Sequence, residues 1–271
     1  MTTLDPDLAP DPTPPGAKVS YEWSGFPWWF VGIAAVIAFP IFKVLTDPTW
    51  HEAFSFIKDG IVLTLTVTGA GFAIAVVLGL IVSLARMSSN PVASNLAQFY
   101  IELIRGLPVI VTIFIVAFVV WDFIMDLLRV SPQSFLASNT VAATVAVGLI
   151  YAAFIAEVFR AGITSVQRGQ REAGMSMGLS KVQVFRLIVW PQALKNVMPA
   201  LGNDLIALLK DSSLVSILAV RELTQMTRLW TGRTFQFMIG FMILAAMYLA
   251  LTVSLSLLLQ WYERKISIPG H

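Results

Sequence analysis

The chain has 271 residues, of which 57% are hydrophobic and 13% are charged, and its formal net charge is +2. Soluble domains carry about 25% charged residues, so this composition indicates an integral membrane protein, and the small net charge gives no support for nucleic-acid binding. The sequence has no cysteine and two histidines, His51 and His271, which excludes disulfides, thiolate metal sites and a histidine-clustered metal centre.

Residues 1–26 differ in composition from the rest of the chain. Prolines alternate here with aspartates, and such a segment cannot bury a core, so we expect a disordered tail. The segment lacks the basic start of a secretory signal, and its apolar run begins too late for one.

Six apolar segments follow, and each approaches the roughly 20 residues that a membrane-spanning helix needs. The sequence therefore predicts an all-α integral membrane protein with six transmembrane helices. The first segment is the weakest, because it is short and Pro40 interrupts it. Glu102 and Arg105 lie near the start of the third segment. The predicted spans are 28–45, 60–85, 100–121, 140–156, 197–220 and 234–262.

A hydrophilic stretch, 157–196, separates the fourth predicted span from the fifth. It contains six cationic residues, and the positive-inside rule places such a loop in the cytoplasm. With six spans, both chain termini are then cytoplasmic. The six are Arg160, Arg168, Arg171, Lys181, Arg186 and Lys195.

Two short helices are predicted within this loop. One covers 167–177, and Gly178 follows it in the usual position for a helix C-terminus. Ser180 and Gln183 form a capping box at the start of the second helix, which Pro191 is expected to end. The pair makes a compact knob, which on this pattern alone could equally be an ordinary structured loop.

The knob resembles the EAA motif of ABC importer permeases. The matching residues are Glu172-Ala173-Gly174, Gly178, Ile188 and Pro191, and Gly174 and Trp190 depart from the usual alanine and leucine. Glycine at 174 is expected to loosen the first short helix by about 1 kcal/mol. The resemblance implies docking into a groove on a separate ATPase, with the contact made by Glu172, Ala173, Gly174, Gly178, Leu179 and Ser180.

Four further segments, 100–108, 157–163, 191–194 and 208–214, resemble the polar amino acid permeases, the histidine, glutamine and arginine type. The resemblance covers roughly 60–265, and it implies a type I ABC importer core of five helices. On this interpretation the transmembrane domain is 57–265, with a coupling loop at about 165–191. The rest comprises a cytoplasmic tail at 1–26, an additional helix and loop at 27–56, and a C-terminal tail at 266–271.

The resemblance also implies the partners and the location. The partners are two copies of an ABC ATPase, a second permease chain that is identical or different, and an extracytoplasmic amino-acid-binding protein. The membrane is the bacterial cytoplasmic (inner) membrane. The chain has no phosphate-binding loop and no Gly-Lys pair, so ATP and Mg are expected on the ATPase and no cofactor or metal on this chain.

Charged residues within the fifth span are the candidate substrate site. Asp204 and Asp211 are seven residues apart, so on a helix they lie within about 20° of one face, and Asn203 and Lys210 form a second stripe about 100° away. Each ionised group costs about 2.5–3.5 kcal/mol at mid-bilayer, which excludes lipid exposure of all three charges. One alternative is that an aspartate only neutralises Lys210. The resemblance favours substrate binding, with the aspartates attracting an ammonium group, Lys210 meeting a carboxylate and Ser212 donating a hydrogen bond.

Thr64 and Thr68 are one turn apart in the second span, near Gly69 and Gly71. Small residues at this spacing are typical of close helix packing, and a substrate contact is the alternative.

The sequence therefore predicts a transport subunit that is not itself an enzyme. An ion-coupled secondary transporter is the main alternative, since intramembrane Asp and Lys also suit ion coupling, but it predicts inverted repeats that the sequence does not show. A membrane enzyme is the third possibility. Copurification with an ATPase distinguishes the first from the other two.

Overall fold

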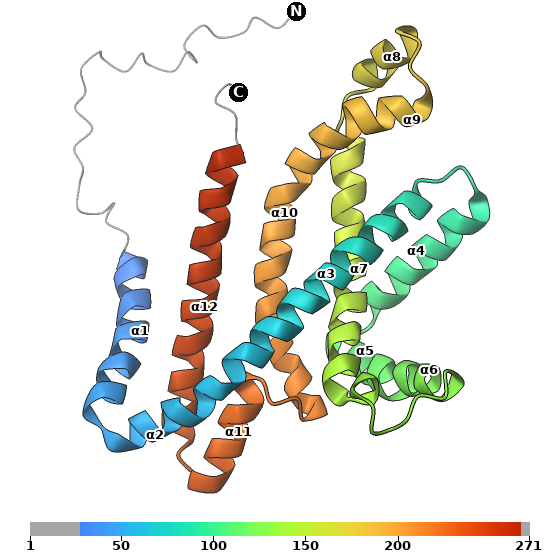
Figure 1. The fold of residues 1–271 in the computed structure, drawn as a ribbon. Helices are drawn as coiled ribbons and strands as arrows, with labels where there is room; N and C mark the ends of the chain where they lie inside the picture. Colours follow the sequence, from blue (N-terminus) through green and yellow to red (C-terminus); the bar gives the residue numbers. More distant parts are fainter. Residues whose placement is uncertain (1–27, 267–271) are drawn as a thin grey trace, which may run out of the picture.

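The computed structural model describes residues 28–266, and every regular element in that part of the chain is a helix (Figure 1). The prediction of an all-α fold is confirmed, whereas the predicted disordered tail at 1–26 lies outside the described residues. The longer helices are α1 (Trp28–Thr46), α3 (Ile61–Arg86), α4 (Pro91–Gly106), α7 (Asn139–Thr164), α10 (Trp190–Asp211) and α12 (Phe237–Ile266). The shorter ones are α2 (Pro48–Ile57), α5 (Val109–Ile115), α6 (Asp122–Leu127), α8 (Arg168–Ser176), α9 (Lys181–Val184) and α11 (Leu223–Thr234).

Four helical stretches are long and apolar enough to cross a membrane: Pro48–Arg86, Val109–Leu127, Asn139–Thr164 and Phe237–Tyr262. A shorter apolar stretch, Val31–Thr46, belongs to α1. Helix α10, in the fifth predicted span, is not among these four stretches. Its 22 residues are enough to span a membrane, but they include Asp204, Lys210 and Asp211. A membrane-spanning chain is confirmed, and the count of six spans stays a prediction.

The third predicted span is wrong as a single helix. Leu107 is extended (φ −101°, ψ 146°), because the ring of Pro108 disfavours helical backbone at the residue before it. Residues 100–106 therefore end α4, which begins after the Asn90 cap, and the apolar span starts only at Val109. Glu102 and Arg105 consequently lie at the end of α4.

Two prolines were expected to interrupt or end helices, and neither does. Pro40 lies inside α1, which is continuous from Trp28 to Thr46. Pro191 lies in the first turn of α10, the part of a helix in which proline is most readily accommodated. A π-helical turn, η6 (Phe185–Val189), joins α9 directly to α10. The predicted end of the helix at Pro191 is therefore wrong, and the knob continues into the fifth predicted span.

The ends of the last two predicted spans also differ from the sequence-based prediction. Helix α10 is followed by a 3₁₀ segment, η7 (Ser212–Leu218), and then by α11, which the sequence did not predict. Thr234 ends α11, Phe235 has a left-handed backbone (φ 57°), and α12 begins at Phe237. The sequence also missed α2.

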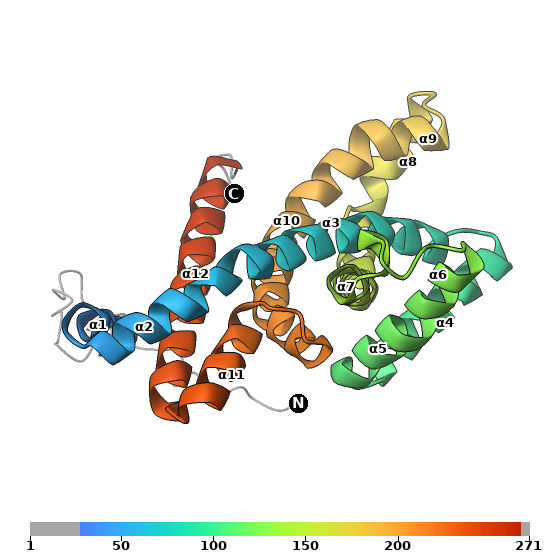
Figure 2. The ribbon, with the colours of Figure 1, turned by 60° about the horizontal axis from the view of Figure 1, so that its bottom comes forward.

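Helix α7 is the centre of the fold and contacts α3, α4, α5 and α10 (Figure 2). Its most extensive contact is with α3, where two glycines permit close approach. A Cβ atom on Gly79 would lie 2.8 Å from Ile155 Cγ2, and one on Gly148 would lie 2.8 Å from Ile74 Cγ2. The close approach of the second span is therefore at Gly79, whereas the glycines noted in the sequence differ from it: a Cβ atom on Gly71 would be in ordinary contact with α7, and one on Gly69 would meet no atom within 4 Å.

The two ends of the helical assembly differ in what they carry. Helices α8 and α9 lie at the same end as the C-terminal end of α12 and the N-terminal end of α1 (Figure 1). Helices α2 and α11 lie at the opposite end. This arrangement agrees with the predicted common side of the loop and both termini, and the identity of that side stays a prediction.

Candidate functional site

The knob, residues 168–189, has the two-helix form that the sequence predicts. Gly178 has φ +83°, a left-handed conformation that L side chains rarely adopt, and it follows the end of α8. The capping box is present: the Ser180 Oγ accepts from the Gln183 amide at 3.3 Å, and the Gln183 side chain accepts from the Ser180 amide at 2.8 Å.

Gly174, one of the two departures from the motif, has a packing role that the sequence did not indicate. It is buried, and a Cβ atom there would lie 2.6 Å from Ile188 Cδ1 and 3.1 Å from Val184 Cγ2. Glycine at 174 therefore lets α8 approach η6 closely. The same glycine lowers the helix propensity of α8, so it has two effects on the knob.

The six predicted coupling residues divide between the surface and the interior of the knob. Gly174 is buried, and Leu179 packs against the apolar cluster beneath the knob. Among the side chains that the structure describes, the exposed Glu172 carboxylate has no hydrogen-bond or ion-pair partner, so it is available to another chain. Met177, at the tip, is 82% exposed. The four exposed coupling residues are Glu172, Ala173, Gly178 and Ser180.

Hydrogen bonds connect the knob to α7 and α10, the long helices that precede and follow it. The Arg171 guanidinium donates to the Ile163 carbonyl at the end of α7. On the other side, the Gln192 amide in α10 donates to Gln170 in α8. A further bond joins α7 and α10 to each other beside the knob, from the Asn196 amide of α10 to Ser165 Oγ at 2.9 Å, just beyond α7. The knob is thus fixed to both α7 and α10.

The aspartates of α10 lie on one face, as their seven-residue spacing predicts. Both are half-buried, and Tyr151 of α7 donates a 2.8 Å hydrogen bond from its hydroxyl to Asp211 Oδ2. One oxygen of Asp204, Oδ2, is buried without a hydrogen-bond partner. Tyr151 was missed by the sequence analysis, although it is the single tyrosine in a predicted span that has no charged residue.

Asn203 and Lys210 form the second stripe on α10, and both are exposed on the surface of this chain. Among the side chains that the structure describes, those of residue 28 and residues 31–262, the ion pair present is Arg160–Glu157, and no carboxylate pairs with Lys210. Neutralisation of Lys210 by an aspartate of the same chain, the alternative to substrate binding, therefore has no support in the structure.

The hydroxyl side chains among the candidates are bonded to backbone. Ser212 is buried and donates to the Leu209 carbonyl at 2.7 Å. Thr64, also buried, donates to the Gly60 carbonyl at 2.9 Å and accepts from the Leu223 amide at 3.1 Å, which joins α3 to α11. Thr68 donates to the Thr64 carbonyl at 2.7 Å. Substrate contact by these three groups stays a prediction.

A second group of polar residues, at the end of the molecule opposite the knob, was missed entirely. Glu222 is fully buried and caps α11 by accepting from the Gln225 amide at 2.8 Å and the Thr224 amide at 2.9 Å. It also accepts from the Tyr248 hydroxyl of α12 at 2.8 Å. Burial raises the pKa of Glu222, against the lowering effect of these hydrogen bonds.

Two glutamates of the sequence are each followed three residues later by an arginine, Glu157 by Arg160 and Glu102 by Arg105, and the two pairs differ in the structure. Glu157 and Arg160 form an ion pair at 2.7 Å. Glu102 instead accepts from Gln98, and the Arg105 guanidinium lies 5.8 Å from the centre of the Phe154 ring.

Among the described residues, no group of three His, Cys, Asp or Glu side chains could hold a metal ion.

Sequence comparison places the chain among known transport proteins. Residues 75–268 match the family described as "Binding-protein-dependent transport system inner membrane component". The probable amino-acid permease protein YxeN of Bacillus subtilis (strain 168) is 33% identical over 218 residues, which cover 80% of this chain and 94% of that protein. The glutamine transport system permease protein GlnP of Escherichia coli (strain K12) is 32% identical, with 80% and 95% covered.

Solved structures have the same fold. A crystal structure of an amino acid ABC transporter with histidines has a TM-score of 0.71 and 31% identity, covering 80% of this chain and 97% of that one. An inward-facing structure of the MetNI methionine ABC transporter has a TM-score of 0.65, 18% identity and 79% and 97% coverage, and it supports the likeness of fold alone.

Proposed function

The chain belongs to the inner membrane components of binding-protein-dependent transport systems, and we propose that it is the permease subunit of an ATP-driven importer of polar or charged amino acids. The observation that carries the proposal is the knob: an EAA-like loop folded as two short helices, with an exposed acid, and hydrogen-bonded to α7 and α10. Relatives named as amino-acid and glutamine permeases, aligned over 80% of the chain, support the substrate class.

The knob is the proposed contact with the ATPase. Glu172, Ala173, Gly178 and Ser180 would meet the ATPase, with Gly174 and Leu179 holding the two helices together. ATP and Mg bind on the partner, two copies of which act with one pair of permease chains. Closure of the ATPase pair would move the knob, and its hydrogen bonds would carry that movement to α7 and α10.

The half-buried face of α10 is the proposed substrate site. Asp204 and Asp211 supply negative charge to an ammonium group, and Tyr151 orients the Asp211 carboxylate. The exposed Asn203 and Lys210 would face a water-filled path or the second permease chain, because lipid exposure of an ionised lysine is costly. Ser212 supplies a hydroxyl beside Asp211, and Thr64 and Thr68 are the remaining candidates, with hydroxyls that are bonded to backbone carbonyls of α3 and its N-cap.

The remaining assignments follow from the same proposal. The chain is in the bacterial inner membrane with both termini in the cytoplasm, on the knob side. An extracytoplasmic amino-acid-binding protein delivers substrate to the opposite end. The second permease chain is a further copy or a related chain.

Copurification and transport test the proposal. Affinity-tagged chain extracted in mild detergent should bring down an ATPase subunit in a one-to-one ratio. Vesicles that contain the two subunits should take up a polar amino acid only when ATP and the binding protein are present. Uptake driven by an ion gradient without ATP would instead establish a secondary transporter.

A further inference from the structure

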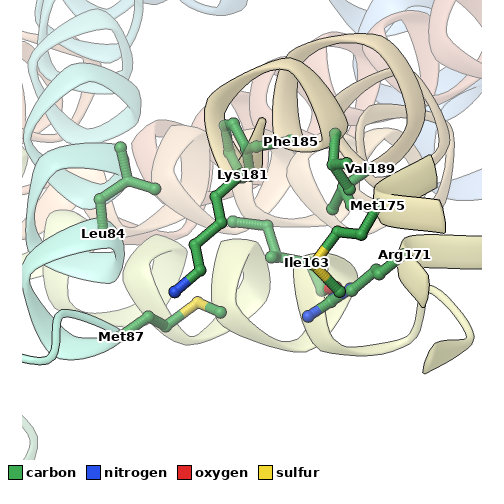
Figure 3. A pocket seen from close by; sticks show the side chains of 9 residues that line it. Leu84, Met87, Ile163, Arg171, Met175, Lys181, Phe185 and Val189 are labelled. Carbon is green, nitrogen blue, oxygen red and sulfur yellow. The ribbon is translucent and has the colours of Figure 1, made fainter. Parts of the chain in front are cut away.

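A pocket of about 430 Å³ lies where the knob meets the ends of α3 and α7 (Figure 3). Its volume is within the range of small-molecule sites. Seven of its nine lining residues are apolar, and the other two, Arg171 and Lys181, are cationic. The lining is Leu84, Met87, Ile163, Arg171, Met175, Lys181, Val184, Phe185 and Val189.

The two cations lack acidic partners in the described part of the chain. Neither forms an ion pair, and the lining contains no carboxylate. Arg171 donates one bond to the Ile163 carbonyl, but its Nε is buried with no acceptor. Figure 3 shows the Lys181 ammonium and the Arg171 guanidinium at the same edge of the pocket. An anionic group at this edge would satisfy both.

The pocket also lies at the level where the apolar spans end. Leu84 and Met87 flank Arg86, the last residue of the stretch Pro48–Arg86, and Ile163 immediately precedes the end of α7 at Thr164. This level is the boundary between hydrocarbon and headgroups, where long cationic side chains extend to the water. Basic pockets between helices at such a boundary suit anionic lipid headgroups.

We propose that this pocket binds one anionic phospholipid, with an acyl chain against the apolar lining and the phosphate between Arg171 and Lys181. A soluble anion would use the two cations but leave the apolar volume empty. A zwitterionic lipid would fill that volume but place a positive choline beside the two cations. The bound lipid would brace the knob against the end of α3. The site is separate from the proposed substrate face, and its test does not depend on the transport activity.

The chain contains no cysteine, so single cysteines can report on this site without background. The full-length chain with Met87→Cys, labelled with bimane, is placed in nanodiscs that contain brominated phosphatidylglycerol or brominated phosphatidylcholine. Bromine quenches bimane on contact. The control position is Val77→Cys on α3, whose side chain is 59% exposed along the span.

We expect phosphatidylglycerol to quench the label at 87 at a lower mole fraction than phosphatidylcholine, and the two lipids to quench the label at 77 equally. Lys181→Gln should raise the phosphatidylglycerol fraction needed at 87 by about fivefold, the effect of one cation near a headgroup. Arg186→Gln, which removes an exposed charge from the same knob but outside the pocket, should leave it unchanged.

Lys181 is exposed, so its replacement should not prevent folding, and the signal at 77 reports whether the variant has inserted. Equal quenching by both lipids at 87, or none by either, would overturn the proposal. An equal effect of Arg186→Gln would show that the lipid is attracted by diffuse surface charge and not by this pocket, which would also overturn the proposal. Relief of quenching by millimolar inorganic phosphate would assign the cations to a soluble anion and also overturn it.

Discussion

Replacing Tyr151 with phenylalanine tests whether the Tyr151–Asp211 hydrogen bond belongs to the substrate site. Phenylalanine keeps the ring that packs in the core but removes the hydroxyl that donates to Asp211 at 2.8 Å. A hydrogen bond to a charged group is worth about 1.5–3 kcal/mol, or about 10- to 150-fold in an equilibrium. Because Asp211 is only half-buried, the lower end applies, and we expect Tyr151→Phe to reduce ATP-dependent uptake about tenfold.

The double mutant gives the sharper measurement. If Tyr151 acts by orienting the Asp211 carboxylate, Asp211→Asn alone should reduce uptake at least as much, and adding Tyr151→Phe should reduce it by less than about twofold more. The assay is initial uptake by reconstituted vesicles, corrected for the amount of folded transporter. Defects that multiply in the double mutant would refute a shared role.

Tyr100→Phe provides a matched control for this cycle. Tyr100 is a partly buried tyrosine of α4 whose hydroxyl also makes an interhelical hydrogen bond, but its partner is the Leu149 carbonyl of α7. Its removal should affect stability without changing the consequence of Asp211→Asn. A similar coupling for Tyr100 would show that the cycle reports general loosening of α7.

Three further predictions concern the knob, the buried acid and the topology. Gly178→Asp, strained at φ +83° by about 1 kcal/mol, and Glu172→Lys, which reverses an exposed charge, should leave the chain inserted but abolish substrate-stimulated ATP hydrolysis; normal stimulation in both would remove the knob from the coupling route. Because the pKa of Glu222 is higher in the folded chain than in the unfolded one, the free energy of unfolding should fall as pH rises above the unfolded value of 4.5 and level off above the folded pKa. Thermal unfolding in detergent should show this fall as the pH is raised from 4.5 in the parent and a smaller one in Glu222→Gln, and identical profiles would contradict the assignment. Impermeant thiol reagents applied to intact cells should label a cysteine at Ser134 and spare one at Gln183, and the reverse pattern would invert the orientation.

Local sequence signals predicted the knob well because its determinants lie within a few residues of one another. The capping box needs only Ser180 and Gln183, and the left-handed backbone at 178 needs only glycine there. The prolines were harder to interpret, because Pro191 can end one helix or begin another. A π turn just before it decided the outcome, and no residue pattern in 185–189 indicated that turn.

The candidate site could be predicted only in part, for a different reason. The seven-residue spacing placed Asp204 and Asp211 on one face, because helix periodicity alone determines it. The partner of that face depends on packing between α7 and α10, which lie far apart in sequence, so Tyr151 could not be identified. Glu222 was missed for the same reason, since its partner Tyr248 is 26 residues away, on another helix.

The continuity of α9, η6 and α10 constrains how the knob can influence the charged face. Helix α10 has 22 residues and is therefore about 33 Å long, so Asp211 lies about a membrane thickness from the knob. Direct contact between the two is impossible, and movement must pass along α10 or through α7. Both routes reach Asp211, because Asn196 fixes the start of α10 to the end of α7 and Tyr151 of α7 bonds to Asp211 near the other end. A tilt of α10 relative to α7 would therefore strain the Tyr151–Asp211 bond. In the proposed site, this bond is the structural element through which movement of the knob would alter substrate binding.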